Sequence, residues 1–279
     1  MRNGNRGQSM RPEPAKRGQD LDSPCSLVVE SVSFRRDRAP EAESLDVPVE
    51  SPLAIEVNGT VAVHLMRLPG HEAELALGHC YAEGYIGGLG DVATLEVCTD
   101  ETGLVRVRTV REVTPRPASV LIPACAGGRL PEERELPAPV ADDGWRMAAA
   151  RLLELMGEMQ AAQTVYAEAR AVHGAGFFAR SGELIVVRED VGRHNAVDKA
   201  IGYCLYHGHP MDGVLATTGR ASSEMVLKAA VARTPIVLSR SGPTSLGIWL
   251  AERLGITLIC YARGTRMSVM THAERIGGN

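Results

Sequence analysis

The sequence has no apolar run long enough to cross a membrane, no signal-peptide pattern and no large excess of positive charge. A spanning helix needs about 20 predominantly apolar residues, and residues 1–24 lack the apolar centre of a signal peptide. With 30 basic against 34 acidic residues, the chain does not have the charge of a protein that coats nucleic acid. We therefore expect a cytoplasmic protein with no membrane and no nucleic-acid partner.

Three common ligand-binding motifs are missing as well. Neither Gly-x-Gly-x-x-Gly nor Gly-x-x-x-x-Gly-Lys occurs, which disfavours a Rossmann dinucleotide site and a P-loop. His173 resembles the first ligand of a zinc deaminase, but the glutamate expected two residues later is Ala175. The companion Pro-Cys-x-x-Cys is also absent, since residues 123–128 read PACAGG with one thiol. A deaminase-like scaffold without zinc remains open.

The six cysteines show no short repeated spacing, so they indicate neither a disulfide framework nor a zinc site. Cys80 falls within a helical pattern, and Cys98, Cys204 and Cys260 lie in or beside apolar segments, where a buried and inert thiol is expected. Cys125 differs, because it lies in LIPACAGGR among alanines and glycines that leave its sulfur little covered. This pattern favours a thiol that is presented to other molecules.

The first 24 residues are rich in Arg, Gly, Pro and Gln and are predicted to be a disordered tail. Apolar and polar residues then alternate on both sides of Asn58 and Gly59, the strongest short-range signal for a β-hairpin. A helical pattern follows over residues 72–86, and two further strands are expected within residues 94–110. We predict that residues 25–115 form a small domain of antiparallel strands packed by one helix.

A loop that carries Cys125 is predicted over residues 116–142, followed by a larger α/β domain over residues 143–279. A helix is expected to begin near Asp143, and a hairpin is expected within residues 171–188. Strand-turn-helix units then follow one another, with strands expected at residues 184–188, 213–218, 235–239 and 256–261. Such repeats indicate a mainly parallel sheet with helices on both faces.

Polar residues gather in the turns that follow these strands, at residues 189–199, 219–224, 239–245 and 261–266. In a parallel sheet these turns share one edge, where ligands bind. Small residues and arginines there could hold an anion at helix N-termini. Ser222, Ser223 and Thr244 could equally be helix caps, but four such turns together favour a ligand that carries phosphate.

Six segments of the chain resemble one known family in order and spacing. They are VESPLAIEVNG (48–58), ELALGHCYAEGYI (74–86), VHGAGFF (172–178), REDVGRHNAVDKAIG (188–202), TGRASSEMVLKA (218–229) and YARGTRMSVMTHAERI (261–276). This combination resembles the FdhD family, the formate dehydrogenase accessory sulfurtransferases. The resemblance covers roughly residues 26–276 and implies a cytidine-deaminase-like fold with an added β-rich region, in a homodimer.

By this resemblance, Cys125 accepts persulfide sulfur from a cysteine desulfurase. It passes the sulfur to the bis(molybdopterin guanine dinucleotide) cofactor of molybdenum or tungsten, bound as a substrate, which is destined for the catalytic subunit of formate dehydrogenase. The segment that binds the cofactor would consist of Tyr261, Ala262, Arg263, Gly264, Thr265 and Arg266. Many members have Cys-x-x-Cys in the reactive loop, but here the second position is Gly128, so Cys125 would act without a partner thiol in that loop.

Residues of the first two turns are further candidates for cofactor contacts, namely Asp190, Arg193, His194, Asn195, Gly219 and Arg220. Alternatively, Asp190 caps the following helix and Arg193 pairs with Glu189 or Asp198. A guanine base would need a carboxylate for its N–H donors, and the sequence does not choose between Asp190 and Asp198. His173 could line the site or fill the core.

Three functions of different classes fit these observations. The first is a sulfurtransferase that acts through Cys125. The second is a chaperone that binds the cofactor and delivers it without sulfur chemistry. The third is a nucleotide-modifying enzyme on a deaminase-like fold, which would require bound zinc.

Overall fold

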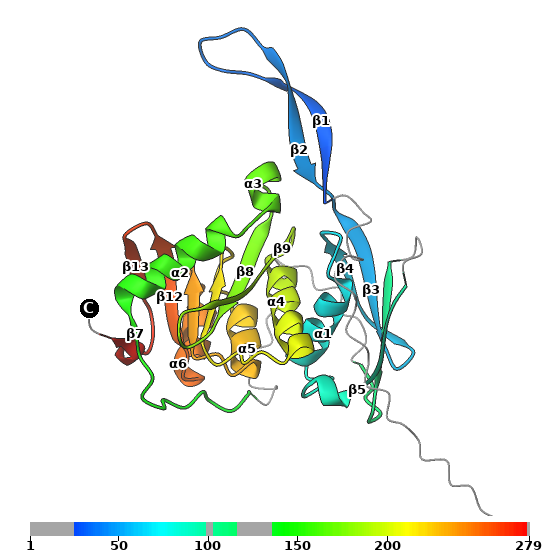
Figure 1. Cartoon of the computed structure of the whole chain (residues 1–279), viewed down its shortest axis with the longest axis vertical. Helices are drawn as coiled ribbons and strands as arrows, with labels where there is room; N and C mark the ends of the chain where they lie inside the picture. The colour runs from blue at the N-terminus through cyan, green and yellow to red at the C-terminus, as the bar shows by residue number, and fades with distance from the viewer. Residues whose placement is uncertain (1–24, 99–102, 116–135, 278–279) are drawn as a thin grey trace, which may run out of the picture.

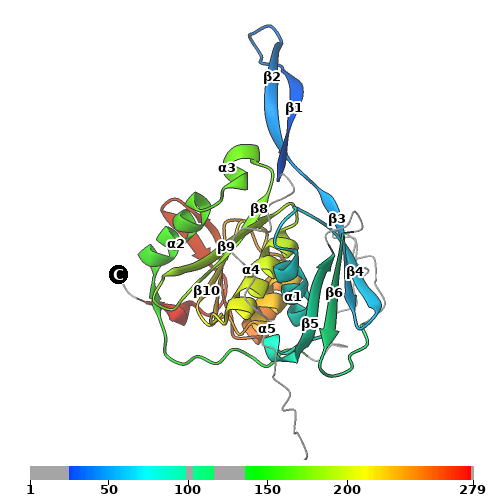
Figure 2. The same ribbon diagram turned by 45° about the vertical axis from the view of Figure 1, so that its right-hand side comes forward.

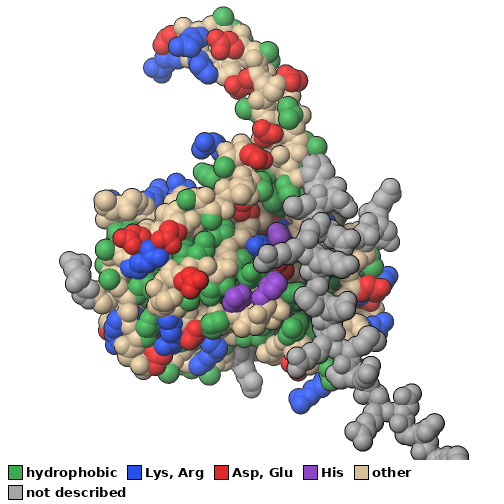
Figure 3. Space-filling view, in the orientation of Figure 1, with side chains coloured by type: hydrophobic (Ala, Val, Ile, Leu, Met, Phe, Trp, Pro, Cys, Tyr) green, Lys and Arg blue, Asp and Glu red, His purple; other side chains and the backbone are tan. Residues whose placement is uncertain are grey.

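The computed structural model describes residues 25–98, 103–115 and 136–277. The predicted tail and Cys125 therefore lie outside the described residues. A two-stranded arm of β1 (Ser26–Ser33) and β2 (Glu41–Pro48) extends away from the body of the molecule (Figure 1). The arm exposes apolar side chains, among them Val28 and Phe34, and Figure 3 shows basic side chains at its tip.

The smaller sheet has the strand order β4-β3-β6-β5, with bounds Thr60–Arg67, Ser51–Val57, Leu104–Thr109 and Val92–Cys98. Asn58 and Gly59 adopt φ values of 51° and 86°, the left-handed conformation that a tight hairpin turn requires, so the predicted hairpin β3–β4 is confirmed. Helix α1 (Glu72–Ala82) packs on this sheet through Leu75 and Cys80. The prediction of purely antiparallel strands is wrong, because β6 returns after α1 to pair with β3 in parallel.

The larger sheet has the order β13-β12-β11-β10-β8-β9. Its strands are β8 (His173–Phe178), β9 (Leu184–Asp190), β10 (Val214–Thr217), β11 (Ile236–Ser239), β12 (Thr257–Arg263) and β13 (Arg266–Val269). Only β10–β11 and β11–β12 are parallel neighbours, while the other three pairs are antiparallel. The expected mainly parallel sheet is thus a mixed one, because the hairpins β8–β9 and β12–β13 add reversed strands. The deaminase-like arrangement stays a prediction.

Helices cover both faces of this sheet, because successive strand residues point to opposite sides. Phe177, Leu215 and Val237 pack against α4 (Arg193–His207), α5 (Ser223–Val231) and α6 (Ser245–Arg253). On the opposite face, Phe178 and Ile236 pack against α2 (Ala149–Ala161). Shorter elements are the helical segments η1 (Leu89–Asp91), α3 (Val165–Ala169) and η3 (Ala273–Arg275), and the strands β7 (Met147–Ala148) and β14 (Ile276–Gly277).

Helix α2 begins at Ala149 and not near Asp143 as predicted. The Asp143 carboxylate instead accepts a hydrogen bond from the backbone N–H of Trp145, at 3.1 Å, and pairs with Arg180. An aspartate that binds the backbone two residues ahead closes a turn rather than a helix.

The two sheets are joined by the close packing of α1 on α4 (Figure 2). A Cβ atom on Gly202 would lie 1.8 Å from the carbonyl oxygen of Glu74, and one on Gly78 would lie 1.8 Å from that of Asp198. Only glycine permits these approaches. The Arg188 guanidinium adds two hydrogen bonds to the Glu74 carboxylate, at 2.6 and 2.8 Å.

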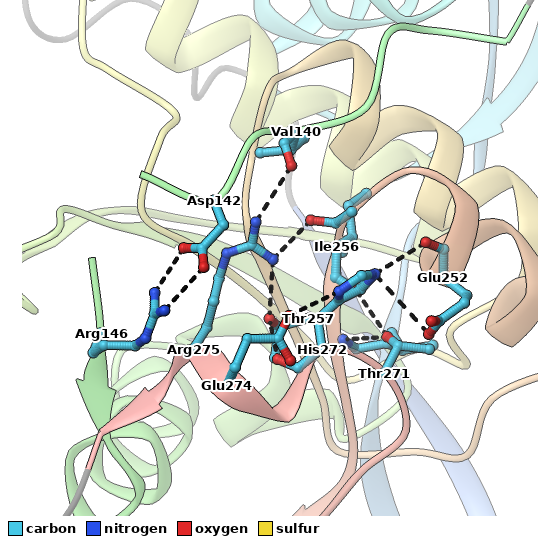
Figure 4. A network of polar contacts seen from close by, with 12 residues as sticks. Val140, Asp142, Arg146, Glu252, Ile256, Thr257, Thr271, His272, Glu274 and Arg275 are labelled. Atoms are coloured by element: carbon cyan, nitrogen blue, oxygen red, sulfur yellow. Dashed lines mark hydrogen bonds and ion pairs between the residues drawn. The ribbon is translucent and has the colours of Figure 1, made fainter. Parts of the chain in front are cut away.

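The segment that follows residue 135 is fixed near the start of β12 (Figure 4). The Arg275 side chain is only 2% exposed and donates to the carbonyl oxygens of Gly255, at 2.7 Å, and Val140, at 3.3 Å. The backbone N–H of Val140 donates to Leu254, at the end of α6. This segment therefore lies at the edge of the sheet where its parallel strands begin. No helix within the described ranges is long and apolar enough to span a membrane.

Candidate functional site

The turns after β9, β10, β11 and β12 meet at the other edge of the large sheet, as the sequence predicts. The Ser239 hydroxyl donates to the carbonyl oxygen of Gly219, at 2.7 Å, which joins the turns after β11 and β10. The Arg263 Nε donates to the carbonyl oxygen of Arg240, at 3.0 Å, and joins the turns after β12 and β11. Arg193 packs its side chain on Gly219. Four turns that are distant in sequence thus form one surface.

Asp190 and Asn195 are buried and bonded within the protein. The Asp190 carboxylate is 0% exposed, lies 2.8 Å from Lys199 Nζ, and accepts hydrogen bonds from the backbone N–H groups of Leu68 and Gly192. The Asn195 amide donates to Asp190 and to the carbonyl oxygen of Met66, at 2.9 and 2.8 Å.

These contacts tie the end of β4 to the turn after β9. The Asp190 oxygens already have partners within the protein, so Asp190 serves the structure, but it bonds Gly192 before α4 and does not cap the first turn of that helix. No ion pair joins Arg193 to Glu189 or Asp198 among the described residues. Asp198 is likewise buried, with Lys228 Nζ 2.6 Å and His79 Nδ1 3.8 Å from its carboxylate. Neither aspartate therefore offers a free acceptor for a guanine base.

A group of basic side chains remains at least partly accessible at this edge, formed by Arg193, His194, Arg220 and His173. Burial lowers the pKa of Arg193, and the charge of Arg220 lowers it further. Burial lowers the pKa of His173 as well, assisted by the charge of Arg193. The two arginines held together in this way create a local positive potential, although the chain as a whole is slightly acidic.

His173 lies beside the turn after β10, with its Nδ1 3.2 Å from the Thr218 hydroxyl. The residue therefore lines the edge and does not fill the core. The sequence analysis did not single out Arg240 or Glu224, although both lie in the predicted turns. Glu224 Oε2 is 2.9 Å from His194 Nε2, a pairing that no sequence spacing predicts.

The predicted cofactor segment forms the turn between β12 and β13. Arg263, Gly264, Thr265 and Arg266 are exposed, and Gly264 has a φ of 55°, the left-handed conformation that glycine adopts most readily. Tyr261 is 43% exposed. Ala262 is the exception: its side chain is 0% exposed and packs in the core beneath α2, so it supports the turn from inside.

Burial makes three of the described cysteines unsuitable as nucleophiles. It raises the pKa values of the Cys80, Cys204 and Cys260 thiols to about 12, and sulfur transfer needs the thiolate. Burial also raises the pKa of Cys25. Cys98 is half-buried rather than buried as expected, with its sulfur 3.2 Å from Arg106 Nη1. Among the parts of the chain that the structure describes, no group of three or more His, Cys, Asp or Glu side chains could hold a metal ion.

The fold and this edge define an α/β protein in which a mixed sheet presents arginines and histidines from four successive turns. Residues 48–277 match the model of the FdhD/NarQ family. The chain belongs to this family.

The relatives that it resembles carry one name. A protein from Bordetella bronchiseptica called sulfur carrier protein FdhD is 35% identical, over 91% of this chain and 96% of the relative. A protein of the same name from Anaeromyxobacter dehalogenans is 38% identical, with the same coverage. A crystal structure from Desulfotalea psychrophila, described as a candidate formate dehydrogenase accessory protein, aligns with a TM-score of 0.77 and 33% identity, over 91% of this chain and all of that one.

Proposed function

We propose that this protein is a sulfurtransferase that serves formate dehydrogenase. Cys125 accepts sulfur from a cysteine desulfurase and transfers it to the bis(molybdopterin guanine dinucleotide) cofactor of molybdenum or tungsten, which is bound as a substrate and then inserted into the dehydrogenase catalytic subunit. The protein acts in the cytoplasm as a homodimer. The observation that carries this proposal is the membership of a family whose relatives are named sulfur carriers, in a chain with Cys125 in its Ala- and Gly-rich segment.

The loading step exchanges one sulfur–sulfur bond for another. The Cys125 thiolate attacks the outer sulfur of the desulfurase persulfide, a new bond forms to Cys125, and the desulfurase cysteine leaves as a thiolate. Nearby positive charge favours the attacking thiolate, and Arg129 is close in sequence. The buried thiols described above, with pKa values of about 12, are protonated at neutral pH and do not compete.

The chain on either side of Cys125 is long compared with the strands of the large sheet. Cys125 follows Pro115 by ten residues and precedes Leu136 by eleven. Ten extended residues span up to about 33–36 Å, whereas a seven-residue strand such as β12 is about 23 Å long. This length supports a role for Cys125 at the arginine-bearing edge, although the segment after residue 135 is anchored at the opposite one.

Guanidinium groups suit the other half of the reaction, because they form paired hydrogen bonds with phosphate oxygens. The cofactor carries two guanine dinucleotide arms, each with a pyrophosphate. Arg193, Arg220 and Arg263 project from three separate turns, so they offer several contacts to such an extended polyanion. The exposed turn at Gly264 lets the ligand approach the backbone closely.

The loading step predicts a covalent change at one peptide. Incubation of the protein with a cysteine desulfurase and cysteine should add one sulfur atom to the peptide that contains Cys125, measured by mass spectrometry. Cys98, half-buried beside Arg106, is the internal control and should remain unmodified. A Cys125 peptide of unchanged mass would show that the protein does not carry sulfur at this residue.

Binding at the β12–β13 turn is tested with GDP, which represents one end of the cofactor. Arg263→Ala and Arg266→Ala should each weaken GDP binding by about tenfold, since a charge-assisted hydrogen bond contributes about 1.5–3 kcal/mol. Isothermal titration calorimetry measures this change, and sulfur loading of Cys125 should be unaffected. Unchanged GDP affinity in both variants would place the ligand elsewhere.

A further inference from the structure

We propose that Arg193 and Arg220 form a subsite for a pyrophosphate group, and that Glu224, held beside this subsite by His194, acts as an internal competing anion while no ligand is bound. The inference deepens the proposed function, since it assigns one part of the ligand to one part of the edge. It makes Glu224 a residue that restricts the subsite to ligands of high negative charge.

Two arginines from different turns are brought together at this edge. Arg193 is the first residue of α4, and Arg220 lies in the turn before α5. A Cβ atom on Gly219 would lie 2.8 Å from the Arg193 Cβ, so glycine is needed there for Arg193 to pack against this turn. The protein thus holds a half-buried guanidinium beside a second positive charge, an unfavourable arrangement that a bound anion relieves.

Polar atoms without partners lie beside these arginines. Arg193 Nε and the Ser222 hydroxyl are both buried and have no hydrogen-bond partner among the described residues. A buried polar group without a partner costs about 1–3 kcal/mol, and such groups usually mark a ligand or a water position. Both atoms are donors that a phosphate oxygen can satisfy.

Two helices, α4 and α5, begin at this point with no side-chain cap. Gly192 precedes α4, and Ser222 precedes α5 without bonding its first turn. In contrast, the Thr244 hydroxyl caps the neighbouring α6 by accepting a hydrogen bond from Gly247 N, at 3.1 Å. The positive ends of the α4 and α5 dipoles therefore add to the charge of the two arginines.

Glu224 supplies the negative charge that this group otherwise lacks. Its carboxylate lies 2.9 Å from His194 Nε2 and remains 51% exposed. The close contact with His194 lowers the pKa of Glu224, and the charges of Lys228 and Arg193 lower it further. The carboxylate is thus ionised within the electrostatic field of Arg193, and an incoming anion must compete with it for that field. An anion with one negative charge gains little by replacing Glu224, whereas pyrophosphate carries enough charge to displace it.

The test is a calorimetric titration of the full chain with inorganic pyrophosphate. Arg193→Gln and Arg220→Gln should each weaken binding by about tenfold, because each removes a charge-assisted contact. Glu224→Gln should instead strengthen it, by about threefold, in line with the modest contribution of an exposed ion pair. Arg151→Gln on the outer side of α2, where Arg151 pairs with Glu154 and Glu158, is the control and should bind as the wild type does.

Two results would overturn the proposal: wild-type affinity in Arg193→Gln, or weaker binding in Glu224→Gln. Thermal unfolding of each variant shows whether a loss of binding reflects a loss of structure. Sulfur loading of Cys125, measured on the same variants, separates the two proposals. If the variants change pyrophosphate binding as predicted but Cys125 stays unmodified, the sulfurtransferase function is wrong and the subsite is supported. If Cys125 is loaded with sulfur but the variants do not change pyrophosphate binding as predicted, the subsite is wrong and the sulfurtransferase function is supported.

Discussion

A bacterial strain that lacks this accessory function should recover formate dehydrogenase activity with the wild-type protein, and should stay at the level of the empty vector with Cys125→Ala. The substitution removes the sulfur atom that carries the persulfide, and no described cysteine is placed to replace it. Cys80, Cys204 and Cys260 are buried, with thiol pKa values of about 12. Formate-dependent dye reduction in cell extracts measures the result.

The matched control is Cys98→Ala, which changes a half-buried thiol on the smaller sheet and should support nearly full activity. Cys125→Ala should also bind GDP as the wild type does, because the arginine contacts are intact. Full dehydrogenase activity with Cys125→Ala would show that the protein delivers the cofactor without sulfur chemistry. The arginines at this edge of the large sheet would then bind the cofactor in a chaperone.

Local features of the fold could be predicted because their causes are local. The Asn58-Gly59 turn needs two left-handed residues, and the sequence contains a pair that adopts this conformation readily. The strands that precede the polar turns were also predicted, so the common edge of the large sheet followed from topology. The pairing of β3 with β6 could not be predicted, because the chain forms α1 and β5 between them and no periodicity encodes that contact.

Contacts between distant parts of the chain also limit what can be predicted of the candidate site. Sequence analysis identified the turn at residues 189–199 but could not divide its polar residues between ligand and structure. The partners that hold Asp190 and Asn195 are Met66 and Leu68, more than 100 residues earlier. The contact between His194 and Glu224 likewise joins residues of two different turns, so no local pattern predicts it. Long-range packing therefore leaves Arg193 at the surface and places Asp190 inside.

Replacing Lys199 with methionine should cause a large loss of stability. The ammonium group is 0% exposed, lies 2.8 Å from the Asp190 carboxylate and donates to the carbonyl oxygen of Leu68, at 2.9 Å. Methionine has a similar length but no charge, so it leaves the carboxylate buried and unpaired. Removing one partner of a buried ion pair costs about 3–5 kcal/mol, and urea unfolding should show a decrease of this size in the free energy of unfolding.

Two further variants separate this effect from a general sensitivity to substitution. Arg108→Met on the exposed side of β6 should change the free energy of unfolding by less than about 0.5 kcal/mol, as surface substitutions usually do. The double variant Lys199→Met with Asp190→Leu should recover part of the loss, because no unpaired charge then remains buried. A double variant less stable than Lys199→Met alone would mean that the hydrogen bonds of Asp190 to Leu68, Gly192 and Asn195 matter more than its charge. The polar residues of this turn would then hold the two sheets together chiefly through the hydrogen bonds that Asp190 accepts, with the ion pair contributing little.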